Sequence, residues 1–302
     1  MKKIAIKKLL VPIDFSNNSM NALQAAAAIA KRHDAMIHLL HVVDNDYDLY
    51  KKDLRLEPPK LGRYMKKLAE LARSVVDHDN VICNYSTEYG SVTHQILSAA
   101  IEFNADMIIM GKNGSNGPSK EYAGTQTCQV AEKARIPVII VPDNVTKYSF
   151  ENILFPMRPL LSGPEKYDAI RSFILKSNPE IFVLNLRNPL YNDELHIIHH
   201  LSLIMKQKLE EDKVPHKMEF YFKDNCFAEK VIEVMAEESN KLDLAVITAE
   251  LDRLNQDFHL GYYAQKVIHQ CLIPLMILHP ETAKPAKATI LDTLGIRNEM
   301  VL

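Results

Sequence analysis

The sequence predicts an α/β protein made of two tandem units, each a five-stranded parallel sheet sandwiched between helices. Two observations support this fold class. Short apolar runs rich in Val and Ile alternate with stretches of helical period, as in successive βαβ units, and the same runs occur twice along the chain. A length of 302 residues is also more than one hydrophobic core usually holds, so we expect two domains.

The internal repeat sets the predicted domain boundaries. Three apolar segments of the first half recur in the second: 9–12 as 153–156, 105–110 as 242–247, and 136–141 as 273–278. The first pair is 144 residues apart and the other two are 137 apart, so the second copy has shorter internal loops. We predict a first domain over residues 1–146, a second over 147–281 and a C-terminal tail over 282–302.

Each predicted element follows from its local pattern. Strands are expected in the first half at 6–13, 36–43, 80–86, 106–110 and 137–141, and in the second half at 152–156, 180–185, 216–222, 243–248 and 274–278. A first helix covers about 19–31, with Ser16 or Ser19 as its N-cap. A second carries apolar residues over 64–76 at spacings of three and four. A third covers 92–103, and a fourth follows Thr125.

Composition and charge exclude several classes of function. A formal net charge of −2 is unlike that of a dedicated nucleic-acid binder, so we expect no nucleic-acid partner. The longest apolar stretches are far shorter than the roughly 18 residues that a membrane helix needs, and the N-terminus has no signal-peptide pattern. We therefore expect a cytoplasmic protein without a membrane partner. The four cysteines form no CxxC motif and are expected to be reduced thiols, mostly buried.

Glycine is scarce, and its positions point to a candidate binding loop. Four of the nine glycines, Gly111, Gly114, Gly117 and Gly124, fall within fourteen residues, directly after the fourth predicted strand and before a helix. Such a loop exposes main-chain N–H groups, and the helix N-terminus adds partial positive charge. The pattern predicts phosphate binding.

The loop is neither a P-loop nor a dinucleotide fingerprint, because the chain has no GxxxxGK[ST] motif and no GxGxxG after the first strand. In a doubly wound sheet, ligands bind at the carboxyl ends of the strands where the winding direction reverses. Asp14 follows the first predicted strand and Gly111 the fourth. A carboxylate near a sugar and a loop near phosphates would suit a nucleotide.

These residues resemble the universal stress protein family. The resemblance rests on segments 12–16 (PIDFS) and 41–44 (HVVD), and on a glycine loop with the spacing Gly-x2-Gly-x9-Gly-Thr over 111–125. The resemblance covers both copies, roughly residues 1–280. The whole chain therefore resembles a tandem protein of this family. It implies an adenine nucleotide α-hydrolase-like fold with strand order 3-2-1-4-5.

The resemblance also implies a nucleotide site in the first copy that takes ATP, with or without Mg²⁺. By position in the family motif, its residues are Asp14 near the adenosine, Val42 at the adenine through its backbone, Gly111, Gly114, Gly124 and Thr125 at the ribose and phosphates, and Lys112 and Gln126 as weaker candidates. Plainer alternatives are a helix-capping role for Asp14, an irregular connection for the loop, and a solvated side chain for Lys112.

The second copy departs from the motif. Arg158 stands at the position of Asp14, Thr248 at that of Gly111, Leu251 at that of Gly114, and Tyr262 replaces the small hydroxyl after Gly261. Side chains there would fill the space that a phosphate needs, so we expect no ATP in this copy. Gly117-Pro118 in the first copy is a further turn signal that could reshape its loop.

The sequence is compatible with three functions. The first is a regulatory, ATP-binding stress-response protein, with at most weak ATP hydrolysis. The second is a slow ATPase or nucleotide-transferring enzyme, for which Asp14 and Glu121 are the acids in the region. The third is a ligand-free scaffold or a metal-binding module centred on His196, His199 and His200, although no HExxH motif is present. We also expect the last strands of the two copies to pair antiparallel as an intramolecular pseudo-dimer, and leave a further homodimer open.

Overall fold

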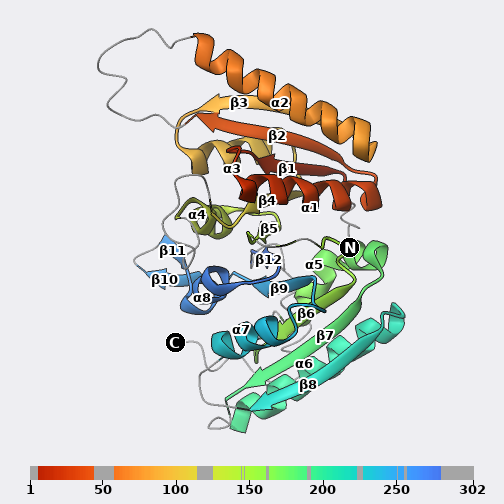
Figure 1. Cartoon of the computed structure of the whole chain (residues 1–302). Helices are drawn as coiled ribbons and strands as arrows, with labels where there is room; N and C mark the ends of the chain where they lie inside the picture. Colours follow the sequence, from red (N-terminus) through yellow and green to blue (C-terminus); the bar gives the residue numbers. More distant parts are fainter. Residues whose placement is uncertain are drawn as a thin grey trace.

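The computed structural model of the chain describes residues 6–43, 58–113, 125–143, 145, 147–160, 163–188, 192–222, 227–249, 251–254 and 257–279. The predicted α/β class is confirmed. The division into two five-stranded sandwiches is not confirmed, because ten strands form one sheet with the order β3-β2-β1-β4-β5-β12-β9-β6-β7-β8 (Figure 1).

The first half contributes five parallel strands and four helices. The strands are β1 (Lys8–Pro12), β2 (Met36–Val43), β3 (Cys83–Tyr89), β4 (Met107–Gly111) and β5 (Val138–Val141). The helices are α1 (Asn17–His33), α2 (Pro58–Asp79), α3 (Val92–Glu102) and α4 (Thr125–Lys133). The strand order 3-2-1-4-5 is the one that the family resemblance implied. Ser16 is the N-cap of α1, and its side chain accepts a hydrogen bond from the Ser19 N–H.

The second half repeats this arrangement. Its strands are β6 (Asn152–Met157), β7 (Glu180–Arg187), β8 (His216–Phe222), β9 (Leu244–Thr248) and β12 (Leu275–Leu278). Its helices are α5 (Gly163–Ser177), α6 (Asn192–Glu211), α7 (Phe227–Glu237) and α8 (Tyr262–Gln270). An antiparallel hairpin of β10 (Leu251–Leu254) and β11 (Asp257–Leu260), which the sequence did not predict, stands between β9 and α8. The first half has its glycine-rich loop at the equivalent place.

An aspartate before the fourth strand of each half shows the repeat in atomic detail. The Asp106 carboxylate accepts hydrogen bonds from the N–H groups of Lys7 and Lys8, at 2.7 and 2.9 Å. Asp243, 137 residues later, accepts them from Glu151 and Asn152, at 2.9 and 3.2 Å. Both carboxylates tie the start of the fourth strand to the start of the first.

The two halves join through their last strands. β5 and β12 pair antiparallel, with Ile139 opposite Met276 and Val138 opposite Ile277. This is the pairing expected for the last strands of the two copies. It covers one sheet edge of each half and leaves β3 and β8 as the edges of the ten-stranded sheet.

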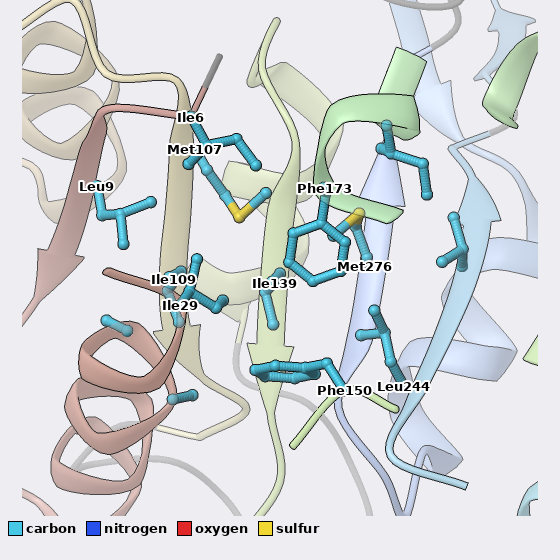
Figure 2. Close-up of a cluster of buried hydrophobic side chains, with 14 of the residues drawn as sticks. Ile6, Leu9, Ile29, Met107, Ile109, Ile139, Phe150, Phe173, Leu244 and Met276 are labelled. Atoms are coloured by element: carbon cyan, nitrogen blue, oxygen red, sulfur yellow. The ribbon is translucent and has the colours of Figure 1, made fainter. Parts of the chain in front are cut away.

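One apolar cluster lies on each face of the sheet, and each cluster runs through both halves. Residues of α1, α2, α5 and α6 pack on one face, and residues of α3, α4, α7 and α8 pack on the other. Figure 2 shows the first cluster at the junction, where Ile139 of β5 lies among Phe150, Phe173 and Met276. The halves therefore share a core.

The predicted domain boundary, C-terminal tail, absence of membrane helices and free cysteines can each be compared with the structure. The predicted boundary at 146/147 falls between β5 and β6, and the division into two domains stays a prediction. The predicted tail over 282–302 lies outside the described residues. No helix in the described segments combines the length and apolar character that a membrane crossing requires. Cys83, Cys128 and Cys271 are free thiols, and burial raises the pKa of each.

Candidate functional site

The carboxyl ends of β1, β2 and β4 meet at one edge of the sheet. Pro12 of β1 pairs with Leu40 of β2, and Asp14 and Val42 each lie two residues farther along these neighbouring strands. β4 pairs with β1 on its other side and ends at Gly111. The winding direction reverses between β1 and β4, so three predicted site residues come together at the switch point.

Asp14 organises the turn from β1 into α1. Its Oδ1 accepts hydrogen bonds from the Ser16 N–H at 3.0 Å and the Ser16 hydroxyl at 2.5 Å. Ser16 in turn caps α1. The capping alternative therefore describes part of what Asp14 does, because the carboxylate holds the capping residue in place.

An aromatic cluster that the sequence did not single out lies beside this turn. The ring of His41 is 4.9 Å from that of Phe15 and 4.3 Å from that of Tyr64, measured between centroids. Phe15 has a φ of 63°, a left-handed conformation that is uncommon for a bulky residue. The ammonium of Lys67 lies 5.0 Å from the Phe15 ring centroid. The apolar stripe on the second predicted helix contained Tyr64, but gave no indication of which strand end it would reach.

His41 is held as a neutral imidazole. Its ring Nδ1 lies 2.7 Å from the Ile13 carbonyl oxygen, to which it donates as the N–H tautomer. Burial lowers the pKa of His41, and the Ile13 carbonyl and Asp14 only partly oppose this effect. His41 therefore fastens β2 to the turn after β1 without adding a charge.

Gly111 lies where β4 presses against α1. A Cβ at this position would come within 2.8 Å of the Asn18 carbonyl carbon and of its Cβ, closer than real atoms approach. The Asn18 side chain donates to the Asn113 carbonyl at 3.0 Å, and the Thr127 hydroxyl donates to the Lys112 carbonyl at 3.1 Å. The start of the loop is thus anchored to α1 and α4.

The remaining predicted residues are not all brought together. Lys112 is buried and its Nζ donates to the Cys271 carbonyl at 3.3 Å, so it faces the second half. Gln126 is exposed and its side-chain oxygen accepts from the Thr93 hydroxyl, which links α4 to α3. Thr125 begins α4. Gly114 and Gly124 lie outside the described residues, as does Glu121.

The second half has a pocket at the equivalent edge of its sheet. The lining residues are Pro156, Arg158, Leu160, Gly163, Lys166, Ile247, Thr248 and Tyr263. The Arg158 guanidinium lies over the Tyr263 ring, 4.1 Å from its centroid. Arg158 and Thr248 thus line the edge where Asp14 and Gly111 stand in the first half.

Within the described part of the chain, the histidines on α6 do not lie in a cluster of metal-binding side chains. The His199 ring packs edge-on against Phe220 at 5.1 Å between centroids. Across the described residues, no three His, Cys, Asp or Glu side chains lie close enough to hold one metal ion.

Both the sequence and the fold of this chain are similar to those of known proteins. A model described as the universal stress protein family matches residues 5–142. The universal stress protein A homolog of Haemophilus influenzae is 32% identical over 142 residues, which cover 45% of this chain and 96% of that protein. A universal stress protein of Synechocystis is 28% identical over 144 residues, which cover 46% of this chain and 87% of that protein. The crystal structure of a universal stress protein from Archaeoglobus fulgidus covers 92% of this chain and 99% of its own, with a TM-score of 0.68 and 16% identity, and so shares the fold of both halves.

Proposed function

This chain belongs to the universal stress protein family, and from that premise we propose that its N-terminal half binds ATP in a regulatory, stress-response role. The observation that carries the proposal is the meeting of Asp14, Val42 and Gly111 at the ends of three adjacent strands, where the winding direction reverses. Asp14 would contact the adenosine, and the main chain at Val42 would contact the adenine.

The residues at this edge fit a nucleotide. Asn18 and Thr127 hold the start of the loop that runs from Gly111 toward α4, and its main-chain amides together with the N-terminus of α4 would bind phosphates. The buried Asn113 side-chain oxygen has no hydrogen-bond partner within the described part of the chain. Such an acceptor would suit a hydroxyl donor of the ribose. Lys112 donates to the Cys271 carbonyl, so it would not contact the nucleotide directly but would help to hold the start of the loop in position.

We propose one nucleotide per chain. The equivalent edge of the second half carries Arg158, Lys166 and Tyr263, whose side chains would occupy the place of the ribose and phosphates. A regulatory role is favoured over catalysis because the Oδ1 of Asp14 is committed to Ser16 and orders the turn. The cytoplasm remains the expected compartment.

Calorimetric titration of the full chain with ATP tests this proposal. We expect one site in the wild type, and binding weaker by about tenfold or more in Gly114→Val, because a branched side chain would block the approach of the phosphates. Gly62→Val is the matched control, since a Cβ at Gly62, on the exposed side of α2, meets nothing within 4 Å. Equal affinity in the wild type and Gly114→Val would overturn the proposal, as would a stoichiometry of two.

A further inference from the structure

We propose that the second half carries its own site for a small tetrahedral oxyanion of the sulfate or phosphate class, held between Arg158 and Lys166. Both residues line the pocket at the carboxyl ends of β6 and β9. Neither cation has a counterpart in the first half. Asp14 stands at the position of Arg158, and Ala22 lies 144 residues before Lys166, the same offset that relates the ends of α1 and α5.

Lys166 is a buried lysine with no counter-charge among the described residues. It is 5% exposed, its Nζ lies 4.6 Å from the Phe155 ring centroid, and one N–H donates to the Pro156 carbonyl at 2.5 Å. None of the ion pairs formed by the described residues includes Lys166. Burial without an anion disfavours the protonated form of an amine, and an anionic ligand beside Lys166 would favour that form.

Arg158 and Tyr263 are the other charged or titratable side chains in the pocket lining. Arg158, from the segment after β6, is close enough to Lys166 that burial first and this neighbouring guanidinium second lower the pKa of Lys166 to about 7. Tyr263 of α8 covers the guanidinium with its ring, and burial raises the pKa of its hydroxyl to about 12, so it stays neutral.

Two carboxyl groups of α5, Glu165 and Asp168, lie close to Lys166 in the sequence. Asp168 forms an ion pair with Lys208 of α6 at 2.8 Å. Glu165 has its pKa raised to about 7, by burial first and by Asp168 second, and Lys208 partly opposes this. The first turn of α5 borders the pocket at Gly163, and its helix dipole adds partial positive charge. Thr248, at the end of β9, brings a hydroxyl donor to the lining.

The walls favour a compact ligand over a whole nucleotide. Leu160, Ile247 and the Tyr263 ring line the pocket together with Arg158 and Lys166. An oxyanion would accept hydrogen bonds from Arg158 and Lys166, whereas a base and a ribose would have to displace these side chains.

Calorimetric titration of the full chain with sulfate, at constant ionic strength in chloride, tests the site. We expect one saturable site in the wild type, and about tenfold or weaker binding in Lys166→Met, which removes the charge but keeps an unbranched buried side chain. Lys176→Met is the matched control, because Lys176 lies on the same helix with its side chain exposed. Arg158→Leu gives the same test should Lys166→Met fail to fold.

A pH arm separates a bound ion from general salt effects. Sulfate stays doubly charged between pH 6 and pH 8, whereas the amine of Lys166 must take up a proton to pair with it. We therefore expect wild-type affinity to be about tenfold higher at pH 6 than at pH 8, and Lys166→Met to lose this dependence.

Three results would overturn the proposal: no saturable sulfate binding, equal affinity in the wild type and Lys166→Met, or Lys166-dependent binding of AMP without binding of sulfate. Gly114→Val should leave sulfate binding unchanged. Failure of the ATP site and failure of the oxyanion site are therefore distinguishable.

Discussion

At the scale of single residues, packing explains Gly111 independently of any ligand. The end of β4 touches the first turn of α1 at Asn18, and a methyl group at Gly111 would lie 2.8 Å from main-chain carbon. The same residue thus fixes the distance between the loop and the turn that carries Asp14.

Gly111→Ala should lower the free energy of unfolding by about 1–3 kcal/mol, because the added Cβ forces α1 and β4 apart. Gly62→Ala should raise it by up to about 1 kcal/mol, because the position is an open helical one where alanine is the better helix former. Chemical denaturation of both variants measures the difference. A neutral Gly111→Ala variant would contradict the close approach.

His33 should make the fold sensitive to acid. It is buried in the last turn of α1 and its ring stacks on Phe173 of α5 at 5.5 Å between centroids. Burial first, then Lys176, lowers the pKa of His33 to about 4. In the unfolded chain His33 becomes protonated below about pH 6.5, whereas in the folded chain it stays neutral down to about pH 4. The free energy of unfolding should therefore fall across this window, by on the order of 1–2 kcal/mol from His33.

Denaturation curves recorded from pH 7 to pH 4.5 check this effect. His33→Leu should show a shallower loss of stability on acidification than the wild type. The exposed His78 provides the control, because His78→Leu should leave the slope unchanged. Parallel pH profiles for the wild type and His33→Leu would exclude His33 as the source.

At the scale of elements, the alternation of apolar and helical segments predicted the main strands because burial on both faces demands continuous apolar runs. The predicted ranges 36–43 and 216–222 agree with β2 and β8, whereas β3 begins three residues later than expected. There the chain leaves α2 through Asn80, whose φ of 53° ends the helix rather than starting a strand. The hairpin of β10 and β11 was missed because the segment 251–260 is short and has no hairpin turn signal.

The site was predictable only where neighbouring strand ends form it. The order of the strands brings Asp14, Val42 and Gly111 together, and the family resemblance implied that order. Lys112 had no such guide, since the carbonyl that it binds belongs to Cys271, 159 residues away. The Phe15, His41 and Tyr64 cluster likewise depends on how α2 lies over the sheet.

Asp106 and Asp243, which link the strand starts, should contribute unequally to the free energy of unfolding. Asp243 is buried and accepts from the Ser149 hydroxyl at 2.8 Å as well as from two main-chain N–H groups. Asp243→Ala leaves these donors unpaired and should lower the free energy of unfolding by about 3 kcal/mol. Asp106 is less buried, and Asp106→Ala should cost about 1 kcal/mol. Equal losses in the two variants, measured by denaturant titration, would show that burial does not set the difference.

At the scale of the whole molecule, the two halves should unfold as one cooperative unit. β5 pairs with β12, both apolar clusters cross this junction, and α1 contacts α5 through His33 and Phe173. Sequence patterns predicted two sheets because each copy contains a complete strand set, while the sharing of a core depends on contacts between distant segments.

Phe173→Ala tests this cooperativity from within the second half. Phe173 is fully buried, and its removal should lower the free energy of unfolding by about 3–5 kcal/mol. Leu175→Ala on the same helix should cost less than about 1 kcal/mol, because Leu175 is 40% exposed. Hydrogen exchange read by mass spectrometry should show faster exchange in β1 and α1 of the first half as well as in α5, alongside a single calorimetric transition. Faster exchange confined to the second half, with two separate transitions, would mean that each half folds on a core of its own.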